Sequence, residues 1–179
     1  MATEARTLTL RPLTREAFAP FGDVLDLRGD PPRPMNGEKA LRYHALGSAS
    51  VAGDEARVVI SMVVSKPVSG LVEVAMVERH PLGSQAFMPL GEGRLLVIVC
   101  PDEDGRPGQP QAFVAASGQG VNYHADVWHG VLAPIDKRQS YLIVDRDGLG
   151  NNLQEHFFDA PWLIQLPGSG LDLDGAAKS

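Results

Sequence analysis

The residues best suited to chemistry stand directly after an apolar run in the middle of the chain. Leu71–Val77 is followed at once by Glu78, Arg79 and His80. Side chains on a strand alternate between its two faces, so a strand here would place Glu78 and His80 on one face and Arg79 on the other. A carboxylate beside an imidazole is suited to proton transfer or to metal binding.

A turn and a further polar residue come next. Pro81–Ser84 is a turn signal, after which the chain continues with Gln85. Two strands joined by this turn would collect Glu78, His80 and Gln85 at one end of a pocket. His129, from a later and separate stretch, is the candidate fourth member of this group.

These four side chains allow two interpretations. Two imidazoles, a carboxylate and an amide oxygen could hold a divalent metal and leave one coordination position open, although Gln85 is a weak ligand because it is neutral. Alternatively, they form a hydrogen-bonded cluster without a metal, in which Glu78 and His80 orient each other. Both interpretations stay open at this point, because spacing does not reveal metal affinity.

The elements that must position these residues are mostly short strands. Apolar and β-branched segments recur at intervals of about ten residues, with Gly and Pro between them, which favours a β-sandwich or β-barrel. Arg57–Val64, rich in β-branched residues, is predicted to be a buried strand. The other predicted strands are Thr7–Leu10, Asp23–Leu27, Leu71–Glu78, Gln85–Met88, Arg94–Cys100, Gln111–Ala115, Val131–Ala133 and Ser140–Asp145.

The remaining segments are predicted to surround these strands. Thr14 is the expected N-cap of a short helix over Arg15–Ala19. Gly29–Gly37 contains three prolines and is predicted to be a loop, as is Pro101–Pro110. The segments expected to dock on the outside of the barrel are Glu155–Phe158 and Trp162–Leu166.

Length and composition limit the possible functions. The 179 residues suit one domain over residues 1–166, followed by a flexible tail over residues 167–179. The net charge of -6 and the lack of a basic stripe argue against nucleic acid as a partner. No window approaches the roughly 20 apolar residues of a membrane span, and no signal peptide is recognisable, so we expect a cytoplasmic protein with no membrane partner. Cys100 is the only cysteine, lies in an apolar run and is predicted to be buried.

Several stretches of the chain resemble a known family. The pattern Glu78-x-His80-x4-Gln85, together with His129, is similar to the metal-binding motifs of cupins. Longer stretches resemble the ureidoglycolate lyases: Glu78–Phe87, Gln119–His124, Val127–His129 and Val144–Arg146. The resemblance implies a mostly β fold, a cupin-like antiparallel β-barrel of the jelly-roll type with a few short helices. It also implies a homodimer and a divalent metal such as nickel.

The resemblance further implies cleavage of the C–N bond of (S)-ureidoglycolate to glyoxylate and urea, in the breakdown of allantoin and purine nitrogen. A base must take the hydroxyl proton of this small-molecule substrate, and an acid must protonate the urea nitrogen. A histidine can do either at neutral pH. We assign these roles to His80 and His129 without deciding between them, and expect Glu78 to orient one ring. A bound metal would chelate the substrate carboxylate and hydroxyl.

Further residues are predicted to contact the substrate. Arg42 is the candidate cation for the substrate carboxylate, with Asn36 and Tyr43 beside it, and the family resemblance extends to these residue types. Gln85 would line the pocket. Asn122 would donate to the urea carbonyl or, alternatively, cap a turn at the barrel rim.

Three other residues near the motifs are predicted to have structural roles. Arg79 is expected to form an ion pair at the surface or at a subunit interface. Arg146 is expected to form a structural salt bridge or to contact substrate. Trp128 lies on the face opposite His129 and is expected to pack in the core or in an interface.

Two other functions remain open from the sequence. One is a different cupin-type enzyme, an isomerase or a dioxygenase, acting on a small hydroxy or keto acid. The other is a non-catalytic cupin that binds a small acid. A binding protein would keep its ligand after loss of His80 and His129, whereas an enzyme would still bind but stop turning over.

Overall fold

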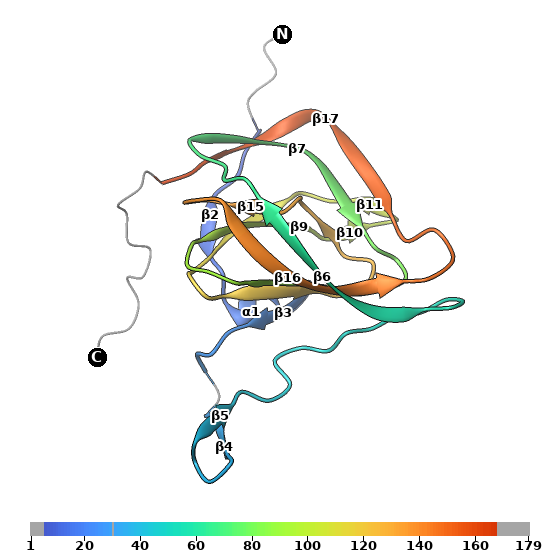
Figure 1. Ribbon diagram of the computed structural model, residues 1–179. Helices are drawn as coiled ribbons and strands as arrows, with labels where there is room; N and C mark the ends of the chain where they lie inside the picture. The colour runs from blue at the N-terminus through green and yellow to red at the C-terminus, as the bar shows by residue number, and fades with distance from the viewer. Residues whose placement is uncertain (1–5, 30, 168–179) are drawn as a thin grey trace.

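The computed structural model describes residues 6–29 and 31–167. Two β-sheets pack against each other, and a small hairpin projects from the body (Figure 1). The predicted tail lies outside the described residues except for Pro167. In the described part of the chain, no helix has the length and hydropathy needed to span a bilayer.

The larger sheet has eight strands and rolls up on itself. Its order is β1-β17-β7-β14-β9-β12-β2, with β15 added on β9. β1 and β2 are consecutive in the sequence but lie at opposite ends of this order, so their short link brings the two ends of the sheet together. The strands are β1 Arg6–Thr7, β2 Leu10–Pro12, β7 Leu71–Arg79, β9 Leu95–Cys100, β12 Gln111–Ala115, β14 Trp128–His129, β15 Ala133–Pro134 and β17 Gln154–Gln165.

The smaller sheet has five antiparallel strands in the order β3-β13-β8-β16-β6, with β6 at one edge. Its strands are β3 Gly22–Leu25, β13 Gly120–Tyr123, β8 Gln85–Pro89, β16 Gln139–Asp147 and β6 Arg57–Ser65. Two further hairpins pair β4 Arg33–Met35 with β5 Ala40–Arg42, and β10 Asp102–Glu103 with β11 Arg106–Pro107. Because most strands pair antiparallel around a closed interior, the predicted mostly β, barrel-type fold is confirmed.

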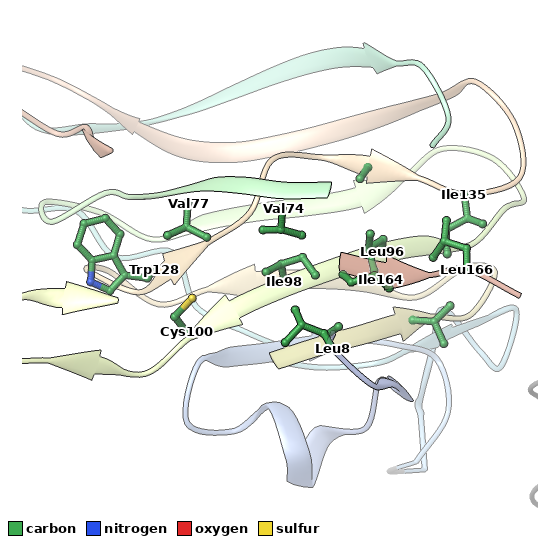
Figure 2. Packing of buried hydrophobic residues seen from close by; sticks show 13 residues of the cluster. Leu8, Val74, Val77, Leu96, Ile98, Cys100, Trp128, Ile135, Ile164 and Leu166 are labelled. Atoms are coloured by element: carbon green, nitrogen blue, oxygen red, sulfur yellow. The ribbon is translucent and has the colours of Figure 1, made fainter. Parts of the chain in front are cut away.

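Two hydrophobic cores lie on the two faces of β9. All six residues of this strand are buried, which explains an apolar run without alternation. One face packs in the core between the two sheets, and the other packs in the core inside the rolled larger sheet (Figure 2). Cys100 belongs to the second core, where burial raises the pKa of its thiol to about 12, so the thiol is unreactive at neutral pH.

The short helix closes the core between the sheets. α1 covers Arg15–Phe18, one residue less than predicted, and the hydroxyl of Thr14 accepts a hydrogen bond from the amide of Ala17 at 3.2 Å. Phe18, at the end of the helix, is fully buried in that core. The predicted N-cap is therefore confirmed.

The prediction that Arg57–Val64 is buried was wrong. β6 is an edge strand, and its outer face is exposed, with Ile60 at 72% and Met62 at 69% of their full accessibility. The β-branched composition identified the strand correctly. It could not show whether another layer of the chain covers that strand, because strand propensity reports only fit to a pleated surface.

The prediction of a loop over Gly29–Gly37 was also wrong, because its second half forms β4, which pairs with β5. The connecting turn has positive φ at Asn36, Gly37 and Glu38, a conformation that Asn and Gly adopt readily. Pro34 fits because a two-stranded hairpin leaves one side of each strand unpaired. Pro101–Pro110 likewise contains the short hairpin of β10 and β11.

The two segments expected to dock outside the barrel form one strand of the larger sheet. β17 pairs with β7 along its length and parallel to β1. A register shift between Phe157 and Trp162 accommodates Pro161, which interrupts the sequence pattern. The predicted strand Thr7–Leu10 is divided between β1 and β2, because its two ends pair with different neighbours.

Candidate active site

Strand register brings the predicted acid and the distant histidine together. His129 on β14 is the register partner of Glu78 on β7, so their side chains lie side by side on one face of the larger sheet. His80 follows β7 directly, and its ring centroid lies 5.3 Å from that of His129. One potential ligand atom from each of the three residues lies within 4.8 Å of the others. We call Glu78, His80 and His129 the cluster.

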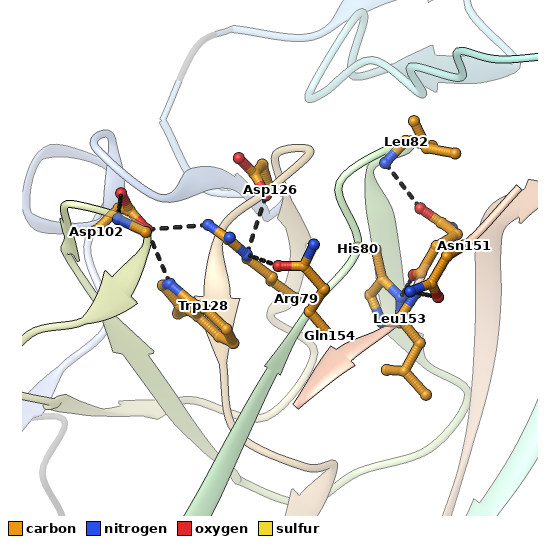
Figure 3. A network of polar contacts seen from close by, with 11 residues as sticks. Arg79, His80, Leu82, Asp102, Asp126, Trp128, Asn151, Leu153 and Gln154 are labelled. Carbon is orange, nitrogen blue, oxygen red and sulfur yellow. Dashed lines mark hydrogen bonds and ion pairs between the residues drawn. The ribbon is translucent and has the colours of Figure 1, made fainter. Parts of the chain in front are cut away.

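Hydrogen bonds at Nδ1 orient both imidazole rings. Nδ1 of His80 lies 2.7 Å from the carbonyl oxygen of Asn152. Figure 3 shows the neighbours of Asn152, Asn151 and Leu153, beside His80. Nδ1 of His129 lies 3.1 Å from the carbonyl oxygen of Gly130. A carbonyl oxygen only accepts, so in each neutral ring Nδ1 carries the hydrogen and Nε2 keeps a lone pair. Among the described residues, neither buried Nε2 atom has a hydrogen-bond partner.

Tyr123 fixes the plane of the His129 ring. The two rings stack with 4.3 Å between their centroids and 6° between their planes. Tyr123 lies on β13 of the smaller sheet, so this contact joins the two walls of the barrel. Burial, followed by the negative charge of Glu78, raises the pKa of the Tyr123 hydroxyl, which is therefore neutral at physiological pH.

Burial also determines the charges of the cluster. It lowers the pKa of His129 to about 4, with the hydrogen bond to Gly130 opposing this effect and the charge of His80 adding to it. His129 is therefore neutral at pH 7. Burial raises the pKa of Glu78, against the charge of His80 and with added repulsion from Glu155. The interior thus favours neutral forms of both groups.

The residues of the cluster fit a divalent metal. Two Nε2 lone pairs and a carboxylate within 4.8 Å of one another form a donor set that nickel and similar metals accept. Each imidazole already donates from Nδ1 to a carbonyl, the outer support that metal-binding histidines usually have. The same donors equally suit proton transfer.

Gln85 lies on the opposite wall from the cluster. The predicted hairpin was wrong, because β7 belongs to the larger sheet and β8 to the smaller, so Pro81–Ser84 crosses between the sheets. Gln85 is the register partner of Tyr123 and shares its inward face. Its amide nitrogen lies 3.4 Å from Asp145, and its buried Oε1 has no partner among the described residues.

Asn122 occupies the other face of the smaller sheet. It precedes Tyr123 on β13, so its side chain points away from the barrel interior. There its amide nitrogen donates to the Asp23 carboxylate at 2.8 Å and to the Ser48 carbonyl at 3.1 Å. The structure does not bring Asn122 to the cluster, and its hydrogen bonds join β13 to β3 and to the segment at Ser48 rather than cap a turn.

The residues predicted to bind the substrate carboxylate lie outside the barrel. Arg42 ends β5, Asn36 is in the turn of the same hairpin, and Tyr43 follows it. Asn36 and Arg42 are exposed and Tyr43 is half-buried. The hairpin projects from the body in Figure 1, so one chain does not bring these residues to its own cluster.

The remaining arginines near the motifs hold the structure together. Arg79 forms ion pairs with Asp102 and Asp126 and lies over the ring of Trp128 (Figure 3). This fits the predicted ion pair and the packing role of Trp128. Arg79 follows Glu78 on β7, so its side chain is on the opposite face of that strand. Arg146 instead donates to backbone carbonyls, which include that of Ala52 at 2.7 Å.

A model of the ureidoglycolate lyase family matches residues 5–165. This chain belongs to the ureidoglycolate lyase family. The ureidoglycolate lyase of Chelativorans sp. (strain BNC1) is 53% identical over 162 residues, which cover 90% of this chain and 98% of that protein. The ureidoglycolate lyase of Mesorhizobium japonicum is 54% identical over 160 residues, which cover 89% of this chain and 98% of that protein.

Solved structures offer a more distant likeness. A dTDP sugar isomerase from Desulfovibrio desulfuricans G20 is 17% identical, and the match covers 78% of this chain and 85% of that one, with a TM-score of 0.46.

Tyr123 and Asp145 are the inward-facing residues that the sequence prediction for this ureidoglycolate lyase family member missed. Both lie on the smaller sheet, Tyr123 against His129 and Asp145 beside Gln85. Alternation within Gly120–Tyr123 was the available signal, because apolar Val121 shares a face with Tyr123. That pattern would have placed Tyr123 inside the barrel and Asn122 outside it.

Proposed function

We propose that this protein is a ureidoglycolate lyase that cleaves the C–N bond of (S)-ureidoglycolate and releases glyoxylate and urea. Family membership and relatives about half identical over most of the chain support this activity. The observation that carries the proposal is a pair of imidazoles, buried His129 and half-buried His80, whose buried Nε2 atoms lie beside a carboxylate and have no hydrogen-bond partner in the described part of the chain. We place the reaction in allantoin breakdown in the cytoplasm, a reducing compartment that suits the free, buried Cys100.

The reaction needs two proton transfers, and the cluster offers a group for each. As the C–N bond breaks, the substrate hydroxyl loses a proton and the urea nitrogen gains one. His129 is neutral at pH 7, so its Nε2 is ready to accept the hydroxyl proton. His80 would donate to the nitrogen, because Glu78 lies 3.9 Å from its Nε2 and would form an ion pair with the protonated ring.

The same residues would hold a divalent metal. Glu78, His80 and His129 would be its ligands, and Gln85 from the opposite wall would be a neutral fourth ligand. When bound, the metal would act as a Lewis acid on the substrate hydroxyl and carboxylate. An Nε2 atom that binds a metal does not accept a proton, so each ring serves one of these two roles at a time.

The products of the reaction test the proposal. Purified protein is incubated with racemic ureidoglycolate, and urea, ammonia and glyoxylate are measured together. We expect equal amounts of urea and glyoxylate, half of the racemate consumed and no ammonia. Ammonia as the main nitrogen product would contradict the lyase reaction. Repeating the assay after chelation and after nickel addition decides between metal binding and proton transfer at the rings.

A further inference from the structure

The hairpin of β4 and β5 has no support within its own chain. We call residues 33–42 the arm. Every residue of the arm is exposed, including the apolar side chains of Met35 and Leu41, and its strands pair only with each other. In Figure 1 the arm projects away from the barrel. An isolated two-stranded hairpin is marginally stable in water, so an ordered arm requires a surface to pack on.

Two arginines stand directly opposite each other on the arm. Arg33 and Arg42 are register partners, so their side chains share one face of the hairpin. Like charges in this position destabilise a strand pair unless an anion lies between them. Among residues 6–29 and 31–167, neither guanidinium has an ion-pair partner. Two adjacent guanidiniums are a strong binding site for a carboxylate.

The barrel interior around the cluster carries carboxylates. The charges that act on Glu78 are those of His80 and Glu155, and no arginine or lysine of the described residues acts on it. Asp145 adds a carboxylate on the facing wall. A substrate carboxylate beside Glu78 would therefore meet His80, and a metal if one is bound, but neither group that acts on Glu78 is an arginine or lysine. Within the described residues, Arg33 and Arg42 of the arm have no ion-pair partner.

The exposed face of β6 indicates that a second copy of the chain supplies the surface on which the arm packs. Val58, Ile60, Met62 and Val64 alternate along the outer face of this edge strand, and all four are exposed. A long edge strand with an apolar exposed face is a surface for another chain. Residues 43–56 form a long extended connection between the arm and β6 (Figure 1), so the arm can extend onto a second copy of the chain seated on β6.

We propose that the arm of one copy crosses to a second copy in a homodimer, where its Arg33 and Arg42 bind the carboxylate of the substrate at the cluster. The identity of that anion rests on the proposed lyase reaction. Each site is then composite, with the cluster from one chain and the cations from the other. This arrangement explains why the predicted carboxylate-binding residues lie away from the cluster of their own chain.

Mixed dimers test this arrangement directly. One chain carries Arg33→Ala with Arg42→Ala, the other carries Glu78→Gln, and different affinity tags isolate the mixed dimer. Each parent dimer should lose most of its activity. If the arm acts on the other copy, one site per mixed dimer has both intact parts, and activity recovers to about half of wild type. No recovery, or no mixed dimer to isolate, would overturn the proposal. Lys39→Ala, in the turn of the arm, is the matched control and should keep wild-type activity.

A second measurement does not depend on activity. Sedimentation and amide hydrogen exchange are compared for wild type, Ile60→Lys and Phe157→Lys, which place the same charge on β6 and on an exposed site of β17. We expect wild type and Phe157→Lys to be dimers with protected arm amides, and Ile60→Lys to be a monomer with rapidly exchanging arm amides. A monomeric wild type would overturn the proposal. A protected arm in a dimer without lyase activity would refute the reaction and support the docking of the arm.

Discussion

Substitutions at Tyr123 separate the role of its ring from the role of its hydroxyl. Tyr123→Phe keeps the ring that stacks 4.3 Å from His129, so we expect kcat to stay within about threefold of wild type, a barrier change below 1 kcal/mol. Tyr123→Leu keeps an apolar side chain but removes the flat partner of His129. The lost stack is worth about 0.5–1.5 kcal/mol beyond the lost area, or roughly 1–6 °C in melting temperature for a chain of this size. We expect its kcat to fall by about 10–100-fold, because losing the outer support of a site residue typically has that effect.

The assay is the rate of glyoxylate formation together with the melting temperature. Phe87→Leu is the matched control, because Phe87 packs against Tyr123 with 6.1 Å between ring centroids in the same core. It should lose similar stability and keep its kcat. If Tyr123→Leu kept wild-type kcat, the stack would not position His129. If Tyr123→Phe lost activity, the hydroxyl would take part in the chemistry.

Three further predictions concern the scaffold. Burial alone would raise the pKa of Asp26, but hydrogen bonds from Gln119 and Arg28 hold that pKa below its usual range. The resulting stability is full above the unfolded-state pKa of this carboxyl and falls as the pH drops through its lower folded-state pKa. Urea unfolding measured across this pH range should show the loss in wild type and not in Asp26→Asn. Gly130→Ala would place a Cβ 2.9 Å from the Cβ of Ile98, so we expect the free energy of unfolding in urea to fall by about 1–3 kcal/mol. We also expect a lower kcat, because the shift would move the carbonyl oxygen of residue 130 that accepts from Nδ1 of His129. Arg79→Met should lower the melting temperature but keep kcat/KM, because the Arg79 ion pairs lie away from the cluster.

Strands whose signal is local could be predicted from the sequence. Gln111–Ala115 matches β12 to the residue, and the apolar run Leu95–Cys100 is β9. The N-cap at Thr14 was predictable for the same reason, because its donor lies only three residues away. In each case the physical cause lies within a few residues of its effect.

The sequence could not show which sheet carries Gln85, because the turn signal before it is the same for a hairpin within one sheet and for a crossover between two sheets. Pro81–Ser84 could return the chain to the same sheet or carry it to another, and the deciding contacts are distant. Ser84 donates its amide to the carbonyl of Ser50 at 2.9 Å and accepts the Ser50 amide at 2.8 Å. The register that sets His129 beside Glu78 is equally non-local.

The exposure of β6 and the projection of the arm could not be predicted for a different reason. Sequence patterns for Arg57–Val64 indicate a strand that is covered, and one chain leaves it open. The pattern and the structure agree if the cover is a second chain. The proposed crossing of the arm to a second copy would explain the placement of Arg42 outside the barrel in the same way.

The rate of glyoxylate release by His80→Gln and His129→Gln, measured beside substrate binding by calorimetry, tests the central claim most directly. If the two imidazoles act on one bound molecule, both variants should still bind ureidoglycolate but turn it over at least about 100-fold more slowly than wild type. Turnover near the wild-type rate in either variant would contradict the assignment of the cluster as the active site.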